Sequence, residues 1–260
     1  MKRILTTLSL LAITLSGTLN AECCCQPQDY SFYIKVGTGV SVSSPANVVA
    51  PSSTWAPAEQ GYNSKLGNKA IADLAIGCEF RHLIDLEVSF SNRSTFEYRK
   101  FQTPVGGGAS YTREFDLDVT PILVSFNLLG RGISRLNWNV GCGKIYPMIG
   151  AGVGLSNLLI TNFRTTGLAP SGASAPHASF SAENEYTLRK NFTYTVLAGI
   201  EYNYSDYWAL ATGYRWFDAG TFKGPRYQRV ATGAAVDVSG DEWEMRFRAN
   251  EWFIEFKIFL

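Results

Sequence analysis

The chain has 260 residues, of which 13% are aromatic and 17% charged, with 24 glycines and a formal net charge of +1. Low charge together with many aromatic residues and glycines argues against a disordered chain and against a nucleic-acid-binding protein. Beyond the N-terminus there is no run of about 18 apolar residues, which excludes membrane-spanning helices in that part.

The N-terminus has the composition of a secretory signal peptide. Two basic residues precede the apolar run Ile4–Leu15, and small and polar residues follow it up to Ala21. We expect cleavage after Ala21. This assigns residues 1–21 to a signal peptide, residues 22–29 to a cysteine-rich periplasmic segment and residues 30–260 to one domain.

Three segments of the first half alternate apolar and polar side chains with the period of two that a β-strand imposes. A loop rich in Ser, Pro, Ala and Asn, at about residues 45–68, separates the first two segments, and a tight turn at 81–83 separates the second from the third. The expected strands are Tyr30–Val42, Lys69–Phe80 and a stretch that begins at Ile84 and runs polar through Arg99. The rows expected to face outward are Phe32, Ile34, Val36, Val40 and Val42; Ala70, Leu74, Ile76, Cys78 and Phe80; and Ile84, Leu86, Val88 and Phe90.

Four further strands are expected before the last one, at Thr112–Asn127, Lys144–Ser156, Asn191–Tyr202 and Trp208–Trp216. The first has the weakest pattern. Its apolar face holds Leu117, Val119, Pro121 and Leu123, and because proline removes a ladder donor we expect a bulge near Pro121. Long loops are expected at 157–190 and 219–241, whereas the connection 129–143 is longer than an ordinary short turn.

The closing strand has the strongest pattern. An unbroken apolar row faces one side, and charged residues alternate with it on the other; the row is Trp252, Ile254, Phe256, Ile258 and Leu260. A tilted strand of about 9–11 residues crosses a bilayer core with apolar side chains towards lipid. The same register places Arg246 and Arg248 outward, so the strand should leave the bilayer near Trp252. We therefore expect Ile258→Arg to impair assembly more than Lys257→Gln.

The count of strands is eight, and long and short connections alternate between them. The sequence predicts an all-β protein, an eight-stranded antiparallel transmembrane β-barrel with short periplasmic turns and long extracellular loops. With an even number of strands, both termini should lie on the periplasmic side.

Three motifs resemble the OmpA-like and opacity-protein-like eight-stranded outer-membrane barrels. Residues 144–155 (KIYPMIGAGVGL) are similar to their fifth strand, residues 198–216 (AGIEYNYSDYWALATGYRW) to their sixth and seventh strands, and residues 118–121 (DVTP) to their fourth. The closing strand also resembles their C-terminal assembly signal, although that signal usually ends in Phe rather than Leu. The resemblance implies residence in the bacterial outer membrane and contact with lipid, lipopolysaccharide and the barrel-assembly machinery. It leaves the function open, because family members serve as anchors, adhesins, invasins and minor pores.

Six charged residues are expected to point into the lumen at middle height: Lys35, Asp73, Glu87, Arg215, Glu251 and Glu255. An eight-stranded barrel is just wide enough for its own side chains, and buried charges must pair. Because the last strand lies between the seventh and the first, Arg215 should reach Glu251 or Glu255, and Lys35 should reach Glu255. We favour a salt-bridged plug over a gate for small ions.

Five cysteines in an exported chain imply an oxidising compartment. Cys23, Cys24, Cys25 and Cys142 should face the same side of the membrane, so a disulfide among them or cross-linking between chains is plausible, since an odd count leaves one thiol over. Metal binding is the weaker interpretation, because no histidine accompanies the cluster. Cys78 should point towards lipid.

Neither the glycines nor the histidines indicate a cofactor or catalytic site. Gly150, Gly152 and Gly154 lack the third glycine and the following helix of a dinucleotide-binding motif, so we interpret them as small inward residues. His82 falls in a short turn, and His177 in the loop 157–190 near Ser and Glu residues that would be needed for hydrolysis. Their spacing does not favour catalysis.

The leading hypothesis is a non-enzymatic outer-membrane surface protein whose loops serve adhesion or other surface contacts, with a possible host ligand, while the barrel supports envelope integrity. A narrow porin or gated channel for small solutes is the second hypothesis, and an embedded hydrolase is the third. We expect no cofactor, metal or nucleic-acid partner.

Overall fold

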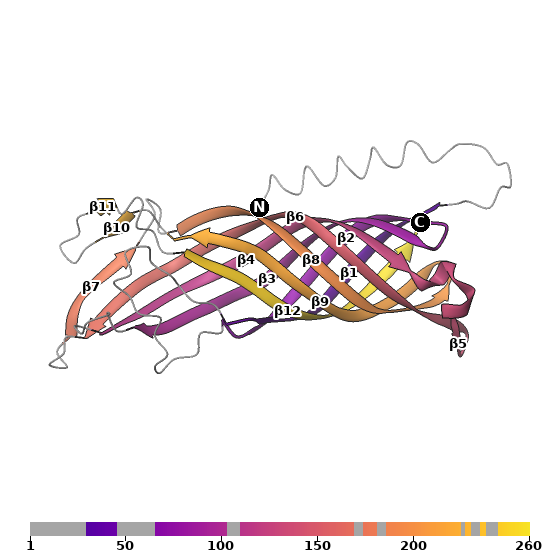
Figure 1. The fold of residues 1–260 in the computed structure, drawn as a ribbon, viewed down its shortest axis with the longest axis horizontal. Coiled ribbons are helices and arrows are strands. Elements are labelled where there is room, and N and C mark those ends of the chain that lie inside the picture. Colours follow the sequence, from indigo (N-terminus) through magenta and orange to yellow (C-terminus); the bar gives the residue numbers. More distant parts are fainter. Residues whose placement is uncertain are drawn as a thin grey trace.

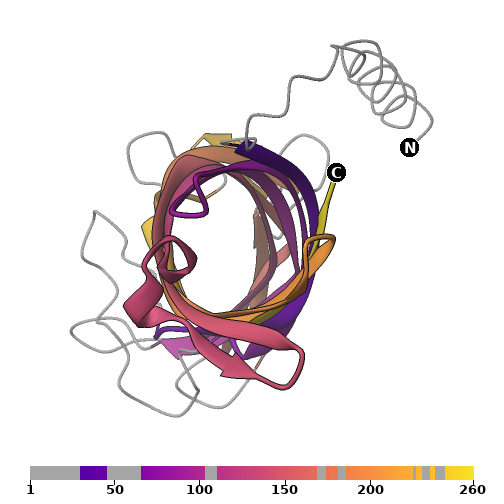
Figure 2. The same ribbon diagram turned by 90° about the vertical axis from the view of Figure 1, so that its right-hand side faces the viewer.

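The computed structural model describes residues 30–45, 66–102, 110–168, 174–180, 186–224, 227–229, 235–237 and 244–260. In these ranges eight long antiparallel strands form a closed barrel, seen from the side in Figure 1 and end-on in Figure 2. The barrel strands are β1 (Tyr30–Ser43), β2 (Asn68–Phe80), β3 (Ile84–Gln102), β4 (Ser110–Leu129), β6 (Gly143–Leu168), β8 (Tyr186–Ser205), β9 (Trp208–Lys223) and β12 (Glu244–Phe259). The predicted fold class is confirmed.

Neighbours in the barrel follow chain order, and the closing strand completes the ring. β12 pairs with β9 on one side and with β1 on the other, with Ile34 opposite Ile258 and Val36 opposite Phe256. No edge is left open between the first and last strands, so every barrel strand has two hydrogen-bonded neighbours.

The apolar rows lie on the outside of the barrel, as the alternation predicts. Leu86 and Ile254 are about half exposed, whereas their inward neighbours are buried. An outer surface of large apolar side chains around an inner set of charges is the reverse of a soluble barrel and is what lipid requires. None of the helices in the described ranges has the length and apolar composition needed to span a bilayer.

One end of the barrel, here named the turn end, holds the short connections. Arg81 and His82 join β2 to β3 with positive φ angles of 50° and 54°, and residues 206–207 join β8 to β9. Two short 3-10 helices, η1 (Gly130–Gly132) and η2 (Ser134–Leu136), and strand β5 (Trp138–Val140) connect β4 to β6. The C-terminal Leu260 lies at the same end, where its N–H donates to the carbonyl of Phe32 over 2.9 Å.

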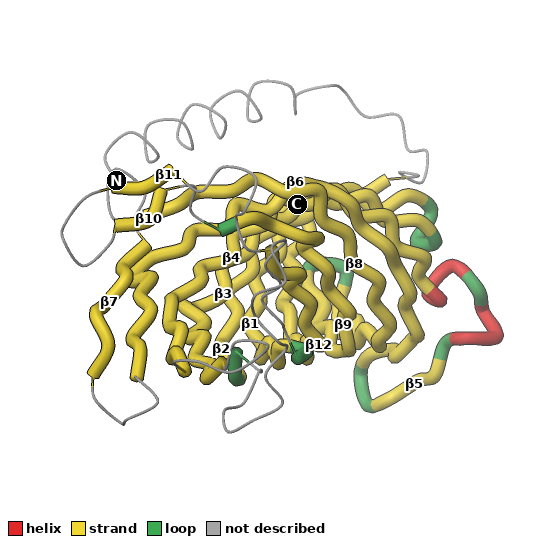
Figure 3. Tube along the Cα trace, turned by 60° about the vertical axis from the view of Figure 1, so that its left-hand side comes forward, coloured by secondary structure: helices red, strands yellow, loops and turns green. Residues whose placement is uncertain are grey.

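The opposite end, the extended end, differs from the prediction. The segment 157–190 was expected to be a loop, but β6 continues to Leu168, β7 (Ser174–Phe180) pairs with it and β8 begins at Tyr186. The segment 219–241 likewise holds the end of β9 and the short strands β10 (Tyr227–Arg229) and β11 (Ala235–Asp237). Figure 3 shows β7, β10 and β11 together at this end, with β5 at the other.

Strand β4 also differs from the prediction. Leu117, Val119 and Leu123 are buried inside, while Ile122 and Val124 are on the outside. The apolar face of β4 therefore changes side along the strand: it faces the apolar interior at Leu117 and Val119, where Asp116 and Asp118 face outward, and it faces outward from Ile122 on. The expected bulge is absent at Pro121, which pairs with Ser156 in register; the irregularities lie between Arg93 and Phe96 in β3 and between Glu114 and Asp116 in β4.

Candidate functional site

The interior of the barrel is divided into a charged half towards the turn end and an apolar half towards the extended end. The charged half is built by strands whose inward positions carry ionic side chains at successive alternate residues. β12 is the main example, because Glu251, Glu255 and Lys257 all point inward from it and are 4% exposed or less. Their partners come from β1, β2, β3, β8 and β9.

The deepest ion pairs surround Glu251. Arg93 donates two hydrogen bonds to this carboxylate, from Nε over 2.6 Å and from Nη2 over 2.9 Å. Arg215 donates from Nε to Glu251 over 2.7 Å and from Nη2 to Asp73 over 2.9 Å. The Ser41 hydroxyl also donates to Glu251, over 2.9 Å. The Arg93 guanidinium lies 3.9 Å from the centroid of the Phe217 ring, at the boundary with the apolar half.

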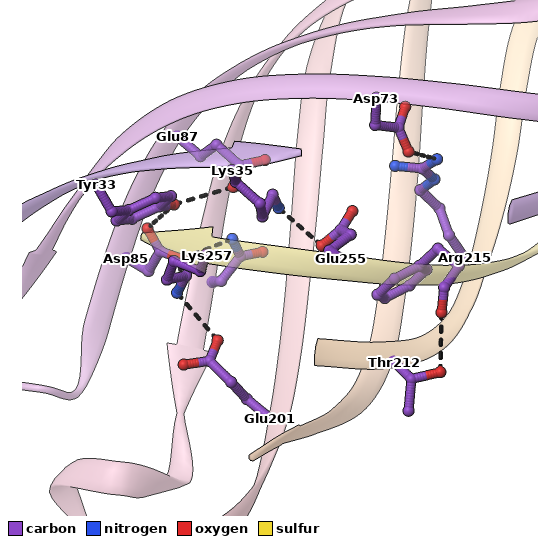
Figure 4. Close-up of polar contacts among 12 residues, drawn as sticks. Tyr33, Lys35, Asp73, Asp85, Glu87, Glu201, Thr212, Arg215, Glu255 and Lys257 are labelled. Atoms are coloured by element: carbon purple, nitrogen blue, oxygen red, sulfur yellow. Dashed lines mark hydrogen bonds and ion pairs between the residues drawn. The ribbon is translucent and has the colours of Figure 1, made fainter. Parts of the chain in front are cut away.

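A second group is centred on Lys35 (Figure 4). Its Nζ lies 2.5 Å from Glu87 and 2.8 Å from Glu255. The Tyr33 hydroxyl lies 2.5 Å from Asp85 and 2.9 Å from Glu87. Because strands β1, β3 and β12 supply these residues, the contacts join strands that are not all neighbours in the sheet.

A third group is centred on Lys257, closest to the turn end. Its Nζ lies 3.0 Å from Glu201, 3.5 Å from Asp85 and 3.8 Å from Glu79. Glu201 also accepts a hydrogen bond from Tyr146. Lys257 is 2% exposed, so the expectation that Lys257→Gln is mild has to be revised: the substitution would leave buried carboxylates without their cation.

All six residues expected in the lumen are buried there, and the two expected ion-pair arrangements are present in the geometry: Arg215 reaches Glu251, and Lys35 reaches Glu255. Sequence reasoning missed Arg93, Lys257 and Glu201 as members of the network. Arg93 was detectable, because it follows the inward residues Asp85, Glu87, Ser89 and Ser91 in unbroken alternation.

Carboxylates outnumber cations in the charged half. Among the described residues it contains seven buried carboxylates, and facing them are four buried cations and Arg131, which reaches Glu79 from η1 over 3.3 Å. The carboxylates are Asp73, Glu79, Asp85, Glu87, Glu201, Glu251 and Glu255; the buried cations are Lys35, Arg93, Arg215 and Lys257. An interior with excess carboxylate favours positive over negative ions.

The apolar half fills the barrel beyond Arg93. Its buried side chains are Leu66, Phe96, Tyr98, Phe115, Leu117, Val119, Leu158, Ile160, Phe163, Phe217, Ala219, Phe222, Met245, Phe247 and Ala249. Phe247 lies near its centre, with ring centroids 5.0 Å from Phe96 and 6.2 Å from Phe217. This half supplies packing rather than polar contacts.

The glycine row of β6 leaves room for residues of the neighbouring strand β4; it consists of Gly150, Gly152 and Gly154. A Cβ at Gly150 or Gly152 would meet the side chain of Asn127 or Ser125, and a Cβ at Gly154 would meet the backbone carbonyl of Ile122. These contacts fit the interpretation of the glycines as small inward residues.

The remaining candidate residues lie apart from the lumen network or outside the described residues. His82 Nδ1 lies 2.8 Å from Glu79 at the turn end. Cys142 is exposed beside β5 and Cys78 is partly buried, whereas Cys23, Cys24, Cys25 and the signal peptide lie outside the described residues, as does the side chain of His177. Within the described ranges no group of three His, Cys, Asp or Glu side chains is arranged to hold a metal ion.

No protein-family model matches the chain, and no curated protein sequence matches it significantly. Among solved structures it is similar to the outer membrane protein OprG from Pseudomonas aeruginosa, with 11% identity, a TM-score of 0.46 and coverage of 88% of this chain and 96% of that one. Neisserial surface protein A gives 13% identity, a TM-score of 0.39 and coverage of 87% and 96%. The outer membrane protease OmpT from Escherichia coli gives 9% identity, a TM-score of 0.39 and coverage of 92% of this chain and 99% of that one. The eight-stranded antiparallel barrel that the sequence motifs led us to expect is present in the structure itself.

Proposed function

We propose that the protein is a non-enzymatic surface protein of the bacterial outer membrane, in which a closed barrel anchors extracellular strands for contacts with molecules outside the cell. One observation carries the proposal: the interior is filled along its length. The ion pairs around Glu251, Lys35 and Lys257 occupy one half, and the packed rings around Phe247 occupy the other.

The extended end supports the second part of the proposal. β6 and β8 continue past Leu155 and Phe192 into a part where their outward rows carry Asn157 and Lys190 before Leu159 and Leu188, and β7 adds a further strand to β6. Strands that project beyond an apolar outer band present a surface to the outside if the turn end is periplasmic, as in other outer-membrane barrels. Specificity would then reside in these projections rather than in the barrel.

Two measurements test this function. Purified protein in planar bilayers should give only small, infrequent currents, since paired charges and apolar rings obstruct the lumen. Cells that display the protein should bind host cells or matrix components, and binding should fall in a variant in which a short turn joins Thr161 to Tyr186, the last paired residues of β6 and β8. Large steady currents, or surface binding that does not depend on these projections, would contradict the proposal.

The narrow pore remains the alternative function. Because buried carboxylates outnumber buried cations, a pore through this lumen would select cations. Cation selectivity in the bilayer recording would therefore support the pore, whereas an unselective leak would indicate a damaged barrel. For a hydrolase, His82 with Glu79 is the pair within hydrogen-bonding distance among the described residues, and it lies at the turn end, away from the extended strands.

A further inference from the structure

A compact ionic cluster lies on the outer face of the barrel, separate from the lumen. The Asp218 carboxylate of β9 is its centre and is fully buried. Arg246 Nη2 donates to it over 2.7 Å and Arg248 Nε over 3.0 Å, both from β12. Tyr194 of β8 completes the cluster, with its hydroxyl 3.2 Å from both Asp218 and Arg246. Three adjacent strands therefore fix two guanidinium groups side by side.

The height of the cluster relative to the lipid-facing surface follows from the outward row of β12. Ile258, Ile254 and Trp252 are exposed apolar residues, and beyond them the same row continues with Asn250 and Arg248. With a rise of about 3.3 Å per residue, Arg248 lies about 13 Å along the tilted strand from Trp252. That is the polar zone just outside the hydrocarbon core, because tryptophans of this kind lie at the headgroup boundary.

Neighbouring aromatic residues support this placement. On β9, Trp216 is the outward residue immediately before Asp218, and its ring lies 5.4 Å from that of Tyr194. On β12, Trp252 lies 5.5 Å from Tyr214, whose hydroxyl is 2.5 Å from Asn250. The cluster thus lies among aromatic residues, since the exposed Phe192 ring also stacks 6.5 Å from Tyr194.

The cluster retains one positive charge, because two arginines share one carboxylate. Burial alone would raise the pKa of Asp218, but hydrogen bonds from Arg246, the Gly220 N–H and Arg248 hold that pKa below its usual value, so Asp218 is ionised at neutral pH. The adjacent ions Lys223 and Glu244 lie 3.6 Å apart and balance each other. The two guanidinium side chains are 45% and 42% exposed, so their outer N–H groups face the surroundings.

We propose that Arg246 and Arg248 bind a phosphate group of a phosphorylated glycolipid in the outer leaflet, with the acyl chains lying against the apolar surface that begins at Trp252. Guanidinium groups bind phosphate through paired N–H donors, and two of them at headgroup height form a site for one anionic lipid. Neutralising Asp218 requires only one of the two arginines. This inference rests on the proposed function, because it needs the extended end to face the outer leaflet.

The test uses full-length protein in neutral detergent, titrated with lipid A that carries two phosphates, and follows binding by tryptophan fluorescence and native mass spectrometry. The double variant R246Q/R248Q should bind at least 10-fold more weakly than wild type. The matched control R81Q/K144Q removes the same charge at the turn end and should bind like wild type. Lipid A stripped of its phosphates should bind wild type as weakly as diphosphorylated lipid A binds the double variant.

Several outcomes would overturn the site. Equal binding of lipid A by the double variant would do so, and so would saturation of wild type by inorganic phosphate at the same concentrations, which would indicate an unspecific anion site. If the double variant fails to fold, the single variants R246Q and R248Q each leave one arginine for Asp218 and should show intermediate affinity. Binding in detergent is independent of location, so membrane fractionation tests the proposed function separately.

Discussion

The two halves of the barrel interior are both filled by side chains, but one is filled by ion pairs and the other by apolar groups. Towards the turn end, Glu251, Lys35 and Lys257 lie in ion pairs that join strands across the lumen; towards the extended end, Phe247 and its neighbours are packed rings. Ion pairs depend on every partner being present, because an unpaired buried charge is costly, whereas an apolar layer loses only the contacts of the atom removed. The halves should therefore respond differently to single substitutions.

The largest effect is expected for Glu251→Ala. Arg93 and Arg215 would then face each other across a space without their shared carboxylate, at a cost of about 3–5 kcal/mol for a buried pair broken on one side. The unfolding midpoint in urea measures it. Glu97→Gln removes a carboxylate of the exposed pair with Lys69 and should cost less than about 1 kcal/mol. Similar losses for both variants would mean that water already hydrates the Glu251 site.

The apolar half is tested by Phe247→Ala, which should cost about 3 kcal/mol through lost ring contacts and the cavity left behind. It should leave bilayer currents small, because the ion pairs still obstruct the lumen. Combining it with Arg215→Ala opens both halves, and currents should rise only in the double variant. A rise with Phe247→Ala alone would show that the charged half does not obstruct ions.

Two consecutive residues of β12 allow a substitution on the lipid-facing side to be compared with one on the lumen side. Ile258→Arg places a cation against lipid at a cost of about 2–4 kcal/mol at mid-depth, less near the interface. Lys257→Gln removes the cation of Glu201, Asp85 and Glu79, and we expect a loss of similar size rather than a small one. Assembly yield and heat-modified gel mobility measure both. If Lys257→Gln caused no loss of assembly, the carboxylates of Glu201, Asp85 and Glu79 would have to be hydrated rather than held by Lys257.

The smallest effect concerns the outer cluster and its pH dependence. The pKa of Asp218 is lowered in the folded state, so its contribution to stability is complete above the unfolded value of about 4 and is lost as pH falls through the lower folded value. Asp218→Asn should thus destabilise at pH 7, and the difference from wild type should shrink in acid. Melting curves at pH 7 and pH 3 measure it; a constant difference would assign the effect to packing.

Cys142 offers a separate check on the cysteine prediction. Its side chain is exposed at the turn end. If it pairs with the cluster Cys23–Cys25, Cys142→Ser should change mobility or reduce cross-linked species on non-reducing gels. Identical migration of wild type and variant, with and without reductant, would identify Cys142 as a free thiol.

The sequence was sufficient where one face of a strand is apolar and the other is not. The rows from Phe32 and Trp252 face outward and the six predicted charges are buried in the lumen, because lipid outside and charge inside produce opposite residue types at successive positions. It was insufficient for β4 and for the extended strands. There Leu117, Leu158 and Phe217 face inward, so apolar character no longer distinguishes inside from outside. Serine and alanine in the β6–β8 connection further suggested a loop.

The position of the ion pairs along the chain has a consequence for assembly. Arg93 and Glu251 are 158 residues apart, and Ser41 and Glu251 are 210 apart. Contacts between residues so far apart in the chain cannot form until the two ends of the barrel sequence have been brought together. The loss of chain entropy on closing this long loop has to be offset first. Before β12 docks, Lys35, Arg93 and Arg215 lack Glu251 and Glu255, the carboxylates that this strand supplies. Docking of one strand then dehydrates and neutralises them together, so closure should be a single cooperative step with few partly closed states.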